Sequence, residues 1–88
     1  MPILFIVNHS GALASCLDIA GAADTVLLIE DGVYGATRTH DWNGHLAALE
    51  PDLRARGLLN RLAPGITVVD DAGFVDLVVA HQPIVTWR

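Results

Sequence analysis

The sequence contains no lysine, a single cysteine and few aromatic residues. Its 88 residues include five arginines against ten acidic residues, for a net charge of −5, and aromatic side chains make up 6% of the chain. A domain that binds nucleic acid directly needs a basic face, so this acidic balance argues against direct RNA or DNA binding. One cysteine excludes an internal disulfide, and nothing in the cysteine usage suggests a secreted, disulfide-stapled fold.

Long apolar runs are also missing. The opening stretch MPILFIVNHSG is apolar, but it has no basic residues ahead of the run. It is also too short for a signal peptide or a membrane span. We therefore expect a cytoplasmic protein that makes no membrane contact.

Two groups of ligand-binding motifs are absent. Gly32 and Gly35 belong to neither G-x-G-x-x-G nor a G-K-[ST] sequence, so nucleotide binding has no support. The nearest pair of histidines, His40 and His45, lies five positions apart, which is not a usual metal-ligand spacing. We expect neither a metal ion nor another cofactor.

What the chain has in excess is hydrophobic residues, at 52% with a mean hydropathy of +0.45. A domain this small buries only about 60–65% of the surface that its unfolded chain exposes. The remaining apolar side chains should form surface patches, and such patches usually contact a partner. The composition therefore predicts an obligate oligomer.

Short apolar runs alternate with helical segments along the whole chain. The runs predict strands at 2–8, 25–30, 66–70 and 84–87, with 45–49 suited equally to a strand or a helix. Helices are expected after Ser10 up to Gly21, from Glu50 to Gly57, and from Asp70 or Asp71 to Gln82, with a short helix and a loop in 33–43. This order predicts a small doubly wound, flavodoxin-like α/β fold. It would be a three-layer sandwich with a mainly parallel sheet of four or five strands, as one domain over residues 1–88.

Polar residues follow the expected strands where a doubly wound sheet binds its ligand. His9 follows the first strand, and Glu30 and Asp31 end the second. These are candidate binding residues, although a polar strand end and an Asp-Gly turn explain them equally well. Trp87 is unusual in a chain so poor in aromatics. It either folds back onto the domain or lies in an interface.

Cys16 allows two interpretations. It shares the apolar stripe of the first expected helix with Leu13, Leu17 and Ala20, which is typical of a packing residue. A reactive cysteine favours a helix N-terminus or a basic neighbour, whereas Cys16 lies about two turns into the helix near Asp18. A His9–Cys16 base–nucleophile pair lacks a residue placed to orient the histidine.

Four segments taken together, SCLDIA, VLLIEDGVYGA, LEPDLRARGL and PGITVVDDAGFVDLVVAHQPIVTW, resemble the DsrH/TusB family in order and spacing. The chain is shorter than the family pattern between Arg38 and Leu46. The resemblance covers almost the whole chain. It implies a subunit of a cytoplasmic heterohexamer with DsrE/TusD-like and DsrF/TusC-like subunits, which relays persulfide sulfur to a downstream sulfur-carrier protein.

That relay ends in tRNA wobble-uridine 2-thiolation in TusB-like members and serves dissimilatory sulfur oxidation in DsrH-like members. The resemblance places the main sulfur-carrying cysteine on the DsrE/TusD-like chain. A cysteine matching Cys16 within SCL is typical of DsrH-like members, which makes Cys16 a possible auxiliary persulfide site. Two alternatives remain: a purely structural subunit without thiol chemistry, and an unrelated flavodoxin-like binding module.

Overall fold

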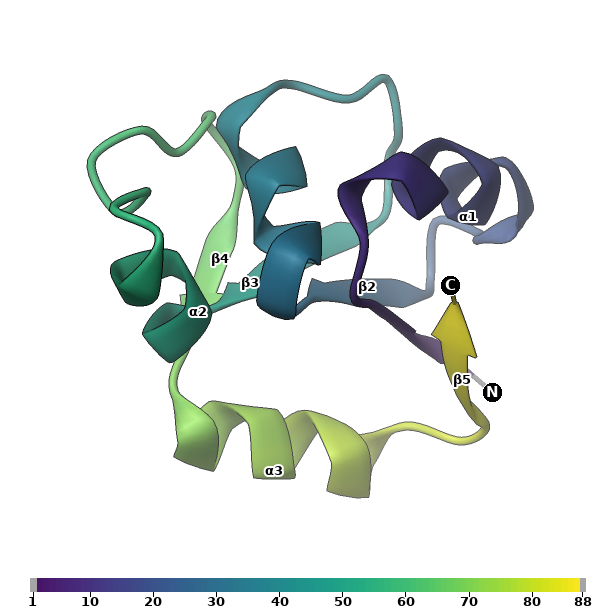
Figure 1. Ribbon diagram of the computed structural model, residues 1–88. Coiled ribbons are helices and arrows are strands. Elements are labelled where there is room, and N and C mark those ends of the chain that lie inside the picture. The colour runs from purple at the N-terminus through teal and green to yellow at the C-terminus, as the bar shows by residue number, and fades with distance from the viewer. Residues whose placement is uncertain (1, 88) are drawn as a thin grey trace.

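The computed structural model describes residues 2–87 as one parallel five-stranded sheet between two layers of helices (Figure 1). The strands are β1 (Leu4–Val7), β2 (Thr25–Leu28), β3 (His45–Leu49), β4 (Thr67–Val69) and β5 (Ile84–Trp87). They lie in the order β4-β3-β2-β1-β5, and every neighbouring pair is parallel. The predicted flavodoxin-like three-layer sandwich is confirmed, as is the position of the last strand at an edge. The ambiguous segment 45–49 is a strand.

The helices follow the predicted segments with differences in detail. The helix expected within 33–43 begins already at Glu30, because the strand expected at 25–30 ends at Leu28. They are the 3-10 helix η1 (Ser10–Ala12), α1 (Leu13–Ile19), the 3-10 helix η2 (Glu30–Thr37), α2 (Glu50–Ala55) and α3 (Asp71–Ala80). Asp70 caps α3, since its side chain accepts a hydrogen bond from the Gly73 N–H. The cap before η1 is His9 and not Ser10 as expected, because the His9 ring nitrogen accepts the Gly11 N–H. The first helix also ends at Ile19, before Gly21.

Alternate residues of each strand point to opposite layers, as strand geometry requires. Phe5, Val7 and Val26 pack with α1, η2 and α2 in the larger of two buried clusters. Leu4 and Leu27 belong to a smaller cluster on the other side, with residues of α3. Because both faces of the inner strands are buried, these strands read as continuous apolar runs in the sequence.

Helix α3 connects the two edges of the sheet. It leaves β4 at one edge, crosses beneath the other strands and leads into β5 at the opposite edge (Figure 1). Among residues 2–87 it is the only helix on its face. Its end is held by His81, which donates from Nδ1 to the Leu77 carbonyl and through Nε2 accepts from the hydroxyl of the buried Thr25.

One glycine is required by a close approach of two backbone segments. A β-carbon on Gly32 would overlap the carbonyl oxygen of Val7 at the end of β1. The contact holds the start of η2 against the carboxyl end of the neighbouring strand, where the Ile29 N–H also donates to the Val7 carbonyl. Glycine at this position therefore sets how closely the polar residues after β2 approach those after β1.

Candidate functional site

The carboxyl edge of the sheet brings the predicted strand-end residues to one side of the molecule. His9 follows β1, Glu30 and Asp31 follow β2, and Trp87 ends β5. From β1 to β4 each new strand is added on the same side of the sheet, and β5 is then added on the other side of β1. The order of the strands therefore reverses at the boundary between β1 and β5. In doubly wound folds the ligand site lies at such a reversal. The residues nearest to it here are His9 and Trp87.

Cys16 lies on the inner side of α1, and its exposed fraction is 0%. Its cluster consists of apolar residues, among them Phe5, Leu13, Val33 and Ala36. The packing follows from the sequence, because Leu13 and Cys16 are three positions apart and so share one side of the helix. The sulfur faces the core.

Burial also changes the acidity of this thiol. Removal from water disfavours the charged thiolate and raises the pKa of Cys16 to about 11. At pH 7 only about one molecule in ten thousand would carry the thiolate, which is the form that attacks sulfur or a metal. A cysteine poised for nucleophilic attack shows the opposite shift.

His9 is exposed and tied to its own turn. Its Nδ1 accepts the Gly11 N–H at 3.0 Å, which leaves Nε2 free to carry the proton of the neutral ring. No hydrogen bond joins His9 to Cys16 within residues 2–87. The arrangement makes His9 the cap of η1 and does not produce a base–nucleophile pair.

Glu30 and Asp31 attach the end of β2 to α2. Glu30 has a positive φ of 49° and donates its N–H to the Asp52 carboxylate at 2.6 Å. The Asp31 carboxylate accepts from Nε and Nη2 of Arg56 at 3.1 and 3.0 Å. Nη1 of Arg56 also lies 3.9 Å from Oδ1 of Asp52, which precedes Arg56 by four residues. Both acidic residues thus take part in a polar network between two elements.

Trp87 folds back onto the domain. Its ring meets Phe5 edge-on with ring centres 6.0 Å apart, and its Nε1 donates to the Ser15 hydroxyl at 2.9 Å. The side chain is half-buried over the same layer that contains α1. Of the two alternatives for this residue, the fold-back is observed within the chain, and a role in an interface stays a prediction.

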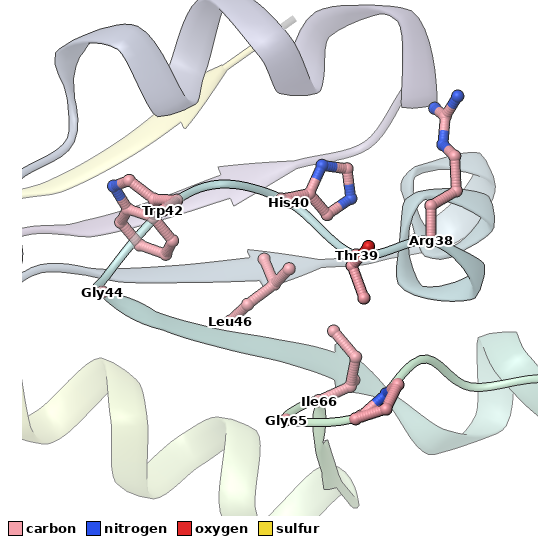
Figure 2. Close-up of a pocket in the computed structure, with 9 residues that line it drawn as sticks. Arg38, Thr39, His40, Trp42, Gly44, Leu46, Gly65 and Ile66 are labelled. Atoms are coloured by element: carbon pink, nitrogen blue, oxygen red, sulfur yellow. The ribbon is translucent and has the colours of Figure 1, made fainter.

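Two cavities that the sequence did not predict flank the segment from Arg38 to His40. One has a volume of about 250 Å³ and extends over Trp42, Leu46 and Ile66, with the side chains of Leu46 and Ile66 both extending toward the segment of Thr39 and His40 in Figure 2. The other, of about 270 Å³, reaches Ser10, Leu13 and Ala14. Neither lining includes an acidic residue. The sequence signal that could have drawn attention to this segment is the presence of Arg38, His40 and Trp42 within five positions.

The loop between these cavities is held by side chains that bond to backbone carbonyls. His40 Nε2 donates to the Gly35 carbonyl at 2.7 Å, and Trp42 Nε1 donates to the Ala20 carbonyl at 3.1 Å. The second contact ties the loop to the end of α1. The loop therefore rests on the helix that contains Cys16.

Within residues 2–87, no three His, Cys, Asp or Glu side chains come together as metal ligands. In the same part of the chain, no helix has the length and apolar character needed to cross a membrane.

Comparison with known proteins gives one consistent result. The family model described as "DsrH like protein" matches residues 7–84. Proteins named "Protein TusB" from Yersinia pestis (strain Pestoides F) and Yersinia pseudotuberculosis serotype O:1b (strain IP 31758) are each 32% identical over 95 residues. These matches cover 97% of this chain and 100% of each relative. The chain therefore belongs to the DsrH/TusB family.

Proposed function

We propose that this chain, as one DsrH/TusB-like domain over residues 1–88, is a subunit of a cytoplasmic sulfur-relay complex that supplies tRNA wobble-uridine 2-thiolation. The observation that carries the proposal is the full-length match to proteins named TusB. The partners would be a DsrE/TusD-like and a DsrF/TusC-like subunit in a heterohexamer, with a sulfur-carrier protein downstream. The net charge of −5 supports an assembly role without direct contact to tRNA.

In this proposal the sulfur travels on cysteines of other chains. A thiolate attacks the outer sulfur of a donor persulfide, a new S–S bond forms, and the donor cysteine leaves as a thiolate. The step needs an accessible thiolate, and Cys16 has 0% exposure and a raised pKa. The chain would instead complete the complex and shape the surroundings of a partner's cysteine.

A second candidate is the DsrH-like role in dissimilatory sulfur oxidation, with Cys16 as an auxiliary persulfide site. The residue itself favours this candidate, because Cys16 within SCL resembles DsrH-like members. The cavity against Leu13 and Ala14 lies one helical turn from Cys16 along α1. Sulfur transfer would then require α1 to open far enough for the thiol to reach that cavity.

Removal of the gene, followed by complementation, tests the proposal. We expect 2-thiouridine in hydrolysed tRNA to fall when this chain is absent. Both the wild-type chain and Cys16→Ala should restore it. Unchanged 2-thiouridine together with a defect in oxidation of stored sulfur would favour the second candidate. An unchanged level of 2-thiouridine and normal sulfur oxidation would contradict both.

A further inference from the structure

Helix α3 is apolar on its outer side as well as on the side that faces the sheet. Phe74, Leu77 and Val78 pack toward the strands, yet no residue of the helix is fully buried. On the outer side, Val75 is 59% exposed and Val79 is 79% exposed. These two valines are four positions apart, so they form one stripe, which Ala72 extends and the exposed Asp76 borders.

A further exposed apolar residue lies on the edge strand β5, which follows α3 in the chain. Ile84 begins β5 and is 41% exposed. It pairs with Leu4, whose side chain lies in the cluster under α3, so Ile84 is on that same face of the sheet. Thr86 lies two residues further on that face and is also exposed. We call Val75, Val79 and Ile84 the α3 surface.

The layer that contains α3 is incomplete for a doubly wound fold. The opposite layer has four helical segments, η1, α1, η2 and α2, whereas α3 alone covers this face within residues 2–87. A helix of ten residues is about 15 Å long and cannot shield a five-stranded sheet. Ile6 and Ile29, on this face of the inner strands, are accordingly only half-buried. Exposed apolar residues gathered on one side of a helix often mark a contact with a partner.

The charges around the α3 surface indicate what kind of chain covers it. Asp70, Asp71 and Asp76 are exposed on or next to the helix, and no arginine occurs between residues 62 and 87. The chain as a whole carries −5. A second copy on this surface would bring the same acidic groups together, which is unfavourable. A chain with arginine or lysine around an apolar face would complement it.

The geometry points to the α3 surface as the docking site for a different protein chain that presents an apolar face bordered by basic residues. This inference rests on the proposed function, because that function supplies the partners, and it names the surface through which this chain joins them. A stable interface needs about 800 Å² from each side. Since one short helix supplies too little, the contact must include the sheet edge at Ile84.

The test uses the complex co-expressed with its DsrE/TusD-like and DsrF/TusC-like chains. The double variant Val75→Gln/Val79→Gln removes apolar surface and keeps both the charge and the helix-forming tendency. Ile19→Gln is the matched control, because Ile19 is 63% exposed on α1 in the opposite layer. We expect the double variant to dissociate from the complex at concentrations at least about tenfold higher than the control. Native mass spectrometry over a dilution series measures this, and equal unfolding temperatures exclude a folding defect.

The outcomes separate the surface from the proposed function. A double variant that stays in an intact complex as firmly as the control would overturn the docking site and leave the function standing. Failure of the wild-type chain to join these partners would overturn both. Asp76→Lys distinguishes the occupants: weaker heteromeric assembly supports a basic partner. Stronger self-association of this chain, with unchanged heteromeric assembly, would assign the surface to a second copy and contradict the inference.

Discussion

Replacement of Cys16 by serine should destabilise the protein more than replacement by alanine, although serine is closer to cysteine in shape. The thiol is 0% exposed in an apolar cluster. Alanine leaves a void of about one heavy atom and should cost about 1 kcal/mol. Serine keeps the volume but buries a hydroxyl. In this cluster the hydroxyl could bond only back to the Ala12 or Leu13 carbonyl of its own helix, and the Ala12 carbonyl already accepts from Ser15, so the expected cost is about 2–3 kcal/mol.

Thermal unfolding followed by circular dichroism measures the difference. For a domain of this size, 1 kcal/mol corresponds to about 4–8 °C in the unfolding midpoint. The serine variant should therefore unfold well below the alanine variant. Equal midpoints for the two variants would show that Cys16 is not sealed in the core. Cys16→Ala is also the better variant for tests of sulfur transfer, because a loss of activity in Cys16→Ser could result from its lower stability.

The acidity of the same thiol predicts a stability change at alkaline pH. The pKa of Cys16 is raised from 9.0 to about 11 by burial, so the unfolded chain loses this proton first. The contribution to stability is complete below pH 9 and is lost as the pH rises to 11. Compared with Cys16→Ala, the wild-type chain should lose about 2–3 kcal/mol over this interval. Urea unfolding at a series of pH values tests this, and parallel curves for the two proteins would contradict it.

Two further predictions concern the backbone. Gly32→Ala should destabilise the fold by about 2–4 kcal/mol because the new β-carbon meets the Val7 carbonyl, which cannot move aside. Gly57→Ala, at φ 67° in open space, should cost only about 1 kcal/mol, and similar unfolding midpoints would refute the assigned contact. Asp24 accepts N–H groups from Ile3 and Gly21, and these bonds lower the pKa of its carboxyl. The contribution of the Asp24 carboxylate to the free energy of unfolding should be present above about pH 4 and should decrease as the pH falls further. Asp24→Asn should flatten that acid dependence in urea titrations, and an unchanged acid limb would count against it.

The fold was largely predictable because strong local patterns agree with the final packing. The uninterrupted apolar runs of β1 and β2 reflect burial on both faces, which is what a parallel sheet between helices requires. Proline in the first turn placed the start of α2, and the two aspartates placed the start of α3. The segment 45–49 could not be assigned from composition, since its alanines and leucines suit either structure. Its pairing with β2 and β4 decides it.

The candidate site was less predictable because it depends on contacts between distant residues. The apolar stripe offered a packing role as one of two interpretations of Cys16, and its burial agrees with that interpretation. No local pattern could pair Asp31 with Arg56, which are 25 residues apart. The capping of η1 by His9 depends on a side-chain rotamer, and competes with the common preference for serine. The cavities beside His40 arise where a loop lies against α1, so they also depend on the tertiary structure.

We propose that this chain serves the relay by assembly while the sulfur resides on cysteines of other chains. The most direct test is an intact-mass spectrum of the co-expressed complex after exposure to a persulfide-loaded donor protein. Under this account a partner chain gains a sulfur atom, the 88-residue chain keeps its mass, and Cys16→Ala changes neither result. A sulfur atom on this chain that disappears in Cys16→Ala would contradict the account and make Cys16 a station of the relay.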